Sequence, residues 1–325
     1  MKVIAGIDIG GTKCAITFAA VDDQRHFSFL DKVKEKTITE EPDRAIGRFI
    51  EIIAQRLASH PDWELLAIGI SCGGPLDSAK GLILSPPNLP LWDKVDIYTP
   101  LEEAFHVPVS MENDANACAL AEWLQGAGQG TENMVFLTFG TGMGAGLILN
   151  GRLYAGTNSM AGEVGHIRLA KDGPMGYGKC GSFEGFCSGS GIAKQGRILA
   201  EEALREHRTV GFCASEEELE TISAAKIAEA MEHGDPTAAR IFSQVAEKLG
   251  QGLSILIDIL NPQVIVIGSI YARQELVLRE KMMEIIRAEA LQQNVEVCKI
   301  CPPGLGEKIG DYAAVTVGWM KYSQY

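Results

Sequence analysis

The stretch Met111-Glu112-Asn113-Asp114-Ala115-Asn116 decides how the 325-residue chain is organised. It follows the apolar run 107–109 and opens a segment, 116–124, that has the composition of a helix. The pattern therefore predicts a strand-to-helix junction at Asp114. A carboxylate fixed at such a junction has the placement that a general base acting on a hydroxyl needs. The plainer interpretation is that Asn113 or Asp114 caps the helix, because Asn and Asp are favoured at that position. Taken alone, the stretch favours the cap.

Two glycine-rich turns, one on each side of this stretch in sequence, change that balance. The first turn, Gly10-Gly11-Thr12-Lys13, joins two Val- and Ile-rich runs. The second turn, Gly140-Thr141-Gly142-Met143-Gly144, joins two further apolar runs. Glycines let the backbone approach a ligand closely and present N–H donors to phosphate. A Gly-Gly pair between strands is also an ordinary hairpin turn. The repeated order of strand, glycine turn and strand indicates an internal duplication with one phosphate loop in each half. The second turn does not open a helix, which argues against a Rossmann fingerprint.

Composition limits the partners of the chain. The residues are 46% hydrophobic and 22% charged, and the formal net charge is -13. An acidic chain lacks the basic surface that binds nucleic acid, so we expect no nucleic-acid partner. No apolar run is long enough to span a membrane, and the N-terminus lacks a signal-peptide layout. The eight scattered cysteines are typical of reduced thiols. We therefore expect no membrane partner and a cytoplasmic location.

The rest of the pattern alternates strands and helices. Helical spacing of apolar residues predicts helices over 43–59 and 236–260, and Val- and Ile-rich residues predict a strand over 295–300. A proline-braced loop, 82–90, carries Asn88. Its amide can bind a sugar-like array of hydroxyls or can simply hydrogen-bond within the loop.

Four motifs, taken in their order and spacing, resemble the ROK (repressor, open reading frame, kinase) family of sugar kinases. They are Asp8-Ile9-Gly10-Gly11-Thr12-Lys13, Glu112-Asn113-Asp114, Gly140-Thr141-Gly142 and Gly162-Glu163-Val164-Gly165-His166. The resemblance covers essentially the whole chain. It implies an α/β, actin/hexokinase-like (ribonuclease H-like) fold that is duplicated into two lobes with a central cleft. The expected N-terminal lobe is 1–113, completed by the C-terminal helix at about 311–325, and the expected C-terminal lobe is 114–310.

The resemblance also implies an activity: ATP-dependent transfer of the γ-phosphoryl group to a hydroxyl of glucose or a related hexose. It implies that Asp114 is the catalytic base and that Asp8 holds Mg²⁺ through water. The implied sugar-binding residues, to which the loop pattern adds Asn88, are Asn113, Glu163, His166 and Glu184. The implied nucleotide-binding residues are Gly10, Gly11, Thr12, Lys13, Gly140, Thr141, Gly142, Gly144 and, beside the adenosine, Gly268. We expect ATP, Mg²⁺ and a sugar as ligands, and a homodimer, because dimers are common in the family.

Two other functions belong to the same family. A transcriptional repressor carries a winged-helix domain ahead of the sugar-binding part, and here the first phosphate loop starts at Asp8. A sugar sensor without catalysis is expected to have lost the base or a phosphate loop, and both are present. The hexose itself is not fixed by the sequence, because candidate sugars present similar hydroxyl arrays.

The resemblance breaks at one motif. Most members bind a structural zinc ion through a histidine and three cysteines, but here Gly178 stands where the first cysteine belongs and only Cys180 matches. Cys187 aligns beyond Glu184 and would need a different loop path to become a ligand. His166, Cys180 and Cys187 make at most three of the four ligands that structural zinc takes. We therefore expect no structural zinc, and activity that survives a zinc chelator.

Overall fold

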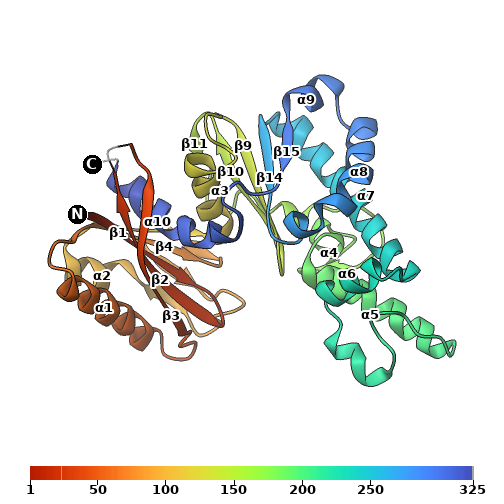
Figure 1. Cartoon of the computed structure of the whole chain (residues 1–325), viewed down its shortest axis with the longest axis horizontal. Coiled ribbons are helices and arrows are strands. Elements are labelled where there is room, and N and C mark those ends of the chain that lie inside the picture. The colour runs from red at the N-terminus through yellow and green to blue at the C-terminus, as the bar shows by residue number, and fades with distance from the viewer. Residues whose placement is uncertain (23, 324–325) are drawn as a thin grey trace. The chain divides into compact units, whose positions relative to one another are not determined.

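The structure is a computed structural model that describes residues 1–22 and 24–323. Its two five-stranded sheets follow one topology (Figure 1). The first has the strand order β3-β2-β1-β4-β8, and the second has the order β11-β10-β9-β14-β15. If the strands of each sheet are numbered 1 to 5 along the chain, both sheets have the spatial order 3-2-1-4-5. The internal duplication that the two glycine turns predict is therefore confirmed in the sheet topology.

The first sheet joins a hairpin meander to two parallel strands. β1 pairs antiparallel with β2 and parallel with β4, and β4 pairs parallel with β8. Its strands are β1 (Lys2–Ile9), β2 (Lys13–Val21), β3 (Phe27–Lys36), β4 (Glu64–Cys72) and β8 (Val109–Asn113). A small sheet follows β4 and contains β5 (Leu76–Asp77), β6 (Leu82–Leu84) and β7 (Asp93–Asp96).

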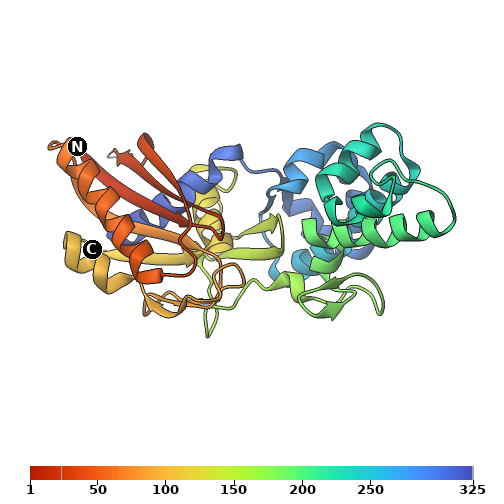
Figure 2. The same cartoon turned by 90° about the horizontal axis from the view of Figure 1, so that it is seen from below.

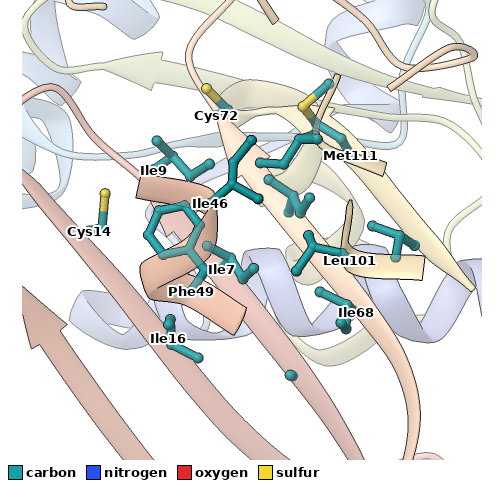
Figure 3. Close-up of a cluster of buried hydrophobic side chains, with 14 of the residues drawn as sticks. Ile7, Ile9, Cys14, Ile16, Ile46, Phe49, Ile68, Cys72, Leu101 and Met111 are labelled. Carbon is teal, nitrogen blue, oxygen red and sulfur yellow. The ribbon is translucent and has the colours of Figure 1, made fainter. Parts of the chain in front are cut away.

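Both faces of the first sheet are covered, so β1 is buried on both sides. Successive side chains of a strand point to opposite faces. Ile7 and Ile9 point toward the helix α1 (Pro42–Ser59), where they share a core with Ile46 and Phe49 (Figure 3). Figure 2 shows α1, in orange, lying along the red strands. The short helix α2 (Tyr98–Phe105) adds Leu101 to the same core.

The helix α10 (Ile309–Tyr322) packs on the opposite face, across β1 and β4. Glycine allows this close approach. A Cβ at Gly6 would lie 2.7 Å from the backbone nitrogen of Val315, and one at Gly69 would overlap the backbone of Ala314. The face of β1 that carries Asp8 is therefore the face against which the N-terminal turn of α10 lies.

Most of the helices lie in the chain segments that connect the strands of the second sheet. Its strands are β9 (Met134–Phe139), β10 (Met143–Leu149), β11 (Arg152–Leu153), β14 (Val264–Ile267) and β15 (Lys299–Cys301). A two-stranded hairpin contains β12 (Met175–Gly176) and β13 (Lys179–Cys180). The helices are α4 (Phe183–Phe186), α5 (Gly189–Arg205), α6 (Ala224–Glu232), α7 (Pro236–Leu260), α8 (Ile270–Glu289) and α9 (Gln292–Val297). Short 3₁₀ turns occupy Val164–His166, Glu216–Thr221 and Gly306–Lys308.

Contacts divide the chain into two compact units. Unit 1 contains Met1–Thr131, Gly146–Ala161 and Gly304–Tyr325, and unit 2 contains Glu132–Ala145 and Gly162–Pro303. The helix α3 (Asp114–Gln125) thus groups with the first sheet. The lobe limits 1–113 and 114–310 remain a prediction.

The strand expected over 295–300 is wrong in its first half, where α9 runs to Val297 before β15 begins at Lys299. Asp258 of α7 accepts hydrogen bonds from the N–H of Leu291 at 3.0 Å and from the amide of Asn294 at 3.1 Å. These contacts fix the first turn of α9, and they come from a residue that the local pattern does not include. The helix expected over 236–260 is confirmed. Among the described residues, no helix combines the length and the hydropathy that crossing a membrane requires.

Candidate active site

Three parallel strands of unit 1 end side by side. In the register of the sheet, Ile9 pairs with Cys72 and Cys72 pairs with Asn113. The residues that follow this row are Gly10, Gly73 and Asp114. Open α/β sheets bind ligands beyond the carboxyl ends of their strands. The first glycine turn and Asp114 therefore share the edge of the sheet where a ligand is expected.

Asp114 is the first residue of α3, so the junction predicted from the sequence is confirmed. Asn113 is the N-cap, and its side-chain oxygen accepts the N–H of Asn116 at 2.8 Å. The cap interpretation thus holds for Asn113 and leaves the carboxylate of Asp114 for another role. Asp114 stays accessible to solvent. The surrounding protein nevertheless removes much of its hydration, which raises the pKa of Asp114, while a hydrogen bond from the N–H of Ala115 opposes the shift. A raised pKa favours service as a general base.

Asp8 shares this edge with three other charged groups. Its pKa is raised from 3.8 to about 6, mainly by desolvation and further by the negative charge of Asp114. The cation of Lys32 lowers the pKa of Asp8, and Asp311 raises it. Lys32 of β3 also donates a hydrogen bond to Asp311 in the first turn of α10. A carboxylate whose pKa is raised by a neighbouring carboxylate belongs to a site that a bound cation would stabilise.

Removal of the Asp8 charge is expected to stabilise the free protein. Because the pKa of Asp8 is higher in the folded chain than in the unfolded chain, the ionised form opposes folding above about pH 6, and the effect vanishes below about pH 4. Without divalent cations, Asp8→Asn should therefore raise the free energy of unfolding at about pH 8 by up to about 3 kcal/mol, since one pKa unit is about 1.4 kcal/mol. Denaturant titrations between about pH 4 and pH 8 would measure this difference. A variant less stable than the parent at about pH 8 would contradict it.

The first glycine turn lies against the loop that carries Asn88. A Cβ built on Gly11 would be 2.6 Å from the Cβ of Asn88 and 3.1 Å from its carbonyl oxygen. The N–H of Gly10 donates to the carbonyl of Lys13 at 3.1 Å, which closes the turn. Asn88 and Lys13 are both exposed, so their polar groups are open to a ligand. The structure therefore brings Asn88 to the first glycine turn, which the sequence does not show.

Gly11→Ala should push the turn and the Asn88 loop apart. Overpacking of this kind costs about 1–3 kcal/mol of folding free energy. Gly73→Ala is the matched control, because no atom lies within 4 Å of a Cβ at that position. Denaturant unfolding of both variants tests the contact. Equal stability of the two variants would show that the loop yields without cost.

The second glycine turn, in unit 2, is held by α4 and α5. Glu184 of α4 accepts the N–H of Met143 at 3.1 Å, and the N–H of Gly189 donates to the carbonyl of Gly140 at 2.7 Å. The N–H of Gly144 donates to the hydroxyl of Thr138 at 2.9 Å. Glu184, predicted as a sugar-binding residue, thus also fixes the turn that follows β9.

A cavity of about 590 Å³ in unit 2 opens beside this turn. Gly140 and Thr141 line one part of it, and Ser269 and Arg273 line another. The N–H of Gly268 donates to the carbonyl of Leu137 at 2.9 Å, and Ser269, the next residue in the chain, lines the cavity. The remaining lining is largely small or apolar: Gly189, Ser190, Ala193, Ile222, Ser223, Ala224, Ala225, Ala228, Phe242 and Ile270, with Glu229, Glu232 and Gln274. The volume lies within the range of small-molecule and cofactor sites.

The Gly162–His166 motif forms a sharp turn followed by one 3₁₀ turn. Gly162 has φ of 92°, and its carbonyl accepts the N–H of Ala145 at 2.7 Å. Glu163 and His166 are both exposed. The ring of His166 is therefore accessible to a ligand.

The cysteines of the candidate zinc loop lie in different surroundings. Cys180 is exposed, whereas Cys187 is fully buried and its thiol donates to the carbonyl of Val245 at 3.5 Å. Among residues 1–22 and 24–323, no group of three or more His, Cys, Asp or Glu side chains is arranged to hold a metal ion. The absence of structural zinc remains a prediction. Mg²⁺, by contrast, needs only one or two carboxylates when phosphates and water complete its shell.

Sequence reasoning missed Lys32 and Asp311, which approach Asp8 from β3 and α10. They are 279 residues apart, and no spacing rule links them. It also missed Ser269 and Arg273 as lining residues of the cavity, although it predicted that Gly268, the residue directly after β14, lies beside the adenosine.

Known proteins match the whole chain. The model of the ROK family matches residues 4–316. A glucokinase from Halalkalibacterium halodurans is 30% identical over 324 residues, which are 98% of this chain and 94% of that protein. A xylose repressor from Caldicellulosiruptor bescii is 28% identical over 305 residues, which are 91% of this chain and 74% of the repressor.

Solved structures agree with the sequence matches. A ROK hexokinase from Thermus thermophilus has a TM-score of 0.80 and 30% identity, and the match covers 99% of this chain and 100% of that one. A ROK family glucokinase from Streptomyces griseus, in complex with glucose and AMPPNP, has a TM-score of 0.73 and 27% identity over 98% and 99% of the two chains. The fold is the actin/hexokinase-like fold that the motifs implied, and the chain belongs to the ROK family.

Proposed function

We propose that this protein is an ATP-dependent hexose kinase that phosphorylates glucose or a related hexose. The observation that carries the proposal is the pair of carboxylates at one edge of the first sheet. Asp114 is accessible and has a raised pKa, and it lies close enough to Asp8 to raise the pKa of Asp8 in turn. Phosphoryl transfer requires a base for the acceptor hydroxyl and neutralisation of phosphate charge more than covalent help from the protein.

The phosphoryl donor would be bound by both glycine turns. The N–H groups of Gly11, Thr12, Thr141 and Gly142, with the side chain of Lys13, are the proposed phosphate ligands. Gly10, Gly140 and Gly144 would shape the two turns, since their N–H groups donate within the turns. The cavity beside Thr141 and Gly268 has the volume for a nucleoside. The Streptomyces griseus glucokinase was solved with AMPPNP, an ATP analogue, which supports ATP as the donor.

Asp8 would hold Mg²⁺, which would neutralise phosphate charge when bound. The fit rests on the raised pKa of Asp8, because a cation would relieve its repulsion with Asp114. The remaining ligands would be water and phosphate oxygens, as is usual for Mg²⁺ in kinases.

The side chains proposed to orient the acceptor sugar are Asn88, Asn113, Glu163, His166 and Glu184. Carboxylate, amide and imidazole groups pair with the hydroxyls of a sugar as donors or acceptors. The oxygen of the sugar hydroxyl would bond to the γ-phosphorus of ATP as the bond to the leaving ADP breaks. Asp114 would accept the proton that this hydroxyl loses.

A coupled assay of ADP release over a panel of hexoses tests the proposal. With ATP and Mg²⁺ in excess, at least one hexose should give turnover of about 1 s⁻¹ or more, which is ordinary for kinases. Saturable sugar binding without turnover would favour the alternative, a sugar-sensing or regulatory protein, as the match to the xylose repressor allows.

A further inference from the structure

The segment that should carry the zinc ion forms a short hairpin instead. β12 and β13 pair antiparallel, with Met175 opposite Cys180 and Gly176 opposite Lys179. Tyr177 and Gly178 form the two-residue turn, both with positive φ (43° and 75°). Positive φ at both central residues is the conformation of a tight hairpin turn. The hairpin therefore has a defined shape that needs no metal ligand at its tip.

Backbone hydrogen bonds attach this hairpin to the residues that follow His166. The carbonyl of Gly181 accepts the N–H groups of Leu169 at 2.8 Å and of Ala170 at 3.1 Å. The guanidinium of Arg168 donates to the carbonyl of Cys180 at 2.7 Å. These hydrogen bonds hold the hairpin against residues 167–170, which directly follow His166.

Two side chains of the hairpin reach His166 directly. The ammonium group of Lys179 donates to the carbonyl oxygen of His166 at 2.7 Å. The ring of Tyr177 meets the imidazole at 5.9 Å between centroids and 73° between planes, which is an edge-to-face contact. Lys179 holds the backbone of His166, and Tyr177 limits the rotation of its ring. A zinc ion bound to the imidazole would likewise fix the orientation of the ring.

We propose that Tyr177 and Lys179 are positioning residues that orient the His166 ring for the acceptor sugar in place of a structural metal ion. The inference rests on the proposed sugar-binding role of His166. Tyr177 is 75% exposed, so the contact with His166 leaves most of its ring open to solvent. The edge-to-face contact with His166 is the interaction through which this exposed ring would act.

Tyr177→Ala should raise the sugar KM about threefold to tenfold, which is the range that an aromatic edge-to-face contact contributes. The kcat and the ATP KM should stay unchanged, because the base and the glycine turns are untouched. Tyr177→Phe should behave as the parent, since the contact uses the ring. Met175→Ala is the matched control, because Met175 is a large exposed side chain of the same hairpin. If Tyr177→Ala and Met175→Ala have equal sugar KM values, the inference fails.

An NMR measurement separates this inference from the proposed function. The chain has only six histidines, so the imidazole signal of His166 can be assigned by its loss in His166→Gln. Tyr177→Ala should move that signal in the sugar-free protein, and Met175→Ala should not. An unmoved signal would overturn the positioning role, whatever the activity. A moved signal, with His166→Gln binding sugar like the parent, would instead overturn the sugar-binding role of His166.

The metal content completes the test. Purified protein should contain far less than one zinc ion per chain, and a zinc chelator should leave both the His166 signal and the sugar KM unchanged. One zinc ion per chain, whose removal moves the signal as Tyr177→Ala does, would show that the metal orients the ring.

Discussion

Asp114→Asn is expected to lower turnover by about 10²–10⁴-fold, the usual contribution of general acid–base catalysis. The amide has the size of the carboxylate and can still accept the N–H of Ala115, so α3 and its Asn113 cap should remain in place. Sugar and nucleotide binding should therefore persist. Isothermal titration of each ligand and the coupled assay would measure binding and turnover separately.

The matched control is Asp43→Asn. Asp43 also lies in the first turn of a helix, α1, and is exposed, so the substitution makes the same chemical change away from the strand ends. It should leave turnover unchanged. If Asp114→Asn keeps more than about a tenth of the parent turnover at saturating substrates, then Asp114 is not the general base.

Glu122→Ala is expected to cause the largest loss of stability. This residue of α3 is fully buried, and its carboxylate accepts three backbone N–H groups: those of Ala127 at 2.7 Å, Gly304 at 2.9 Å and Leu305 at 2.9 Å. A donor left without an acceptor costs about 1–3 kcal/mol where water cannot replace the acceptor, and these donors are only partly buried, so the free energy of unfolding should fall by about 1–3 kcal/mol or more. Denaturant unfolding with constant m-value would measure it.

Glu122→Gln is the informative comparison, because its single carbonyl oxygen can still accept part of these hydrogen bonds. It should lose less stability than Glu122→Ala. Hydrogen exchange should become faster at Ala127, Gly304 and Leu305 in both variants. Equal, small losses of stability in the two variants would mean that water replaces the carboxylate.

The sequence alone predicted the features whose causes are local. The change from an apolar run to a helical pattern located Asp114, and the glycine pairs located both turns that join strands. The duplication followed from repetition of the same order. Each of these features is determined by residues that lie close together in the sequence, so it can be predicted without knowledge of tertiary contacts.

Features that depend on distant residues were not predictable. Asp311 reaches Asp8 because α10 packs closely on β1 at Gly6 and on β4 at Gly69, and Lys32 approaches Asp8 from β3. Glu122 lies in an ordinary helical pattern, yet its partners come from residues 127 and 304–305. The helix α9 replaced an expected strand because Asp258 holds its first turn. In each case a tertiary contact overrides or extends the local pattern.

The most direct measurement of the kinase proposal is transfer of label from [γ-³²P]ATP to the preferred hexose. The proposal predicts labelled sugar phosphate in a one-to-one ratio with ADP, in the parent and in Asp43→Asn, and almost none in Asp114→Asn. ADP formed without labelled sugar phosphate would show that water is the acceptor. Sugar binding with no label transfer at all would contradict the kinase assignment and would leave a sugar-sensing member of the ROK family.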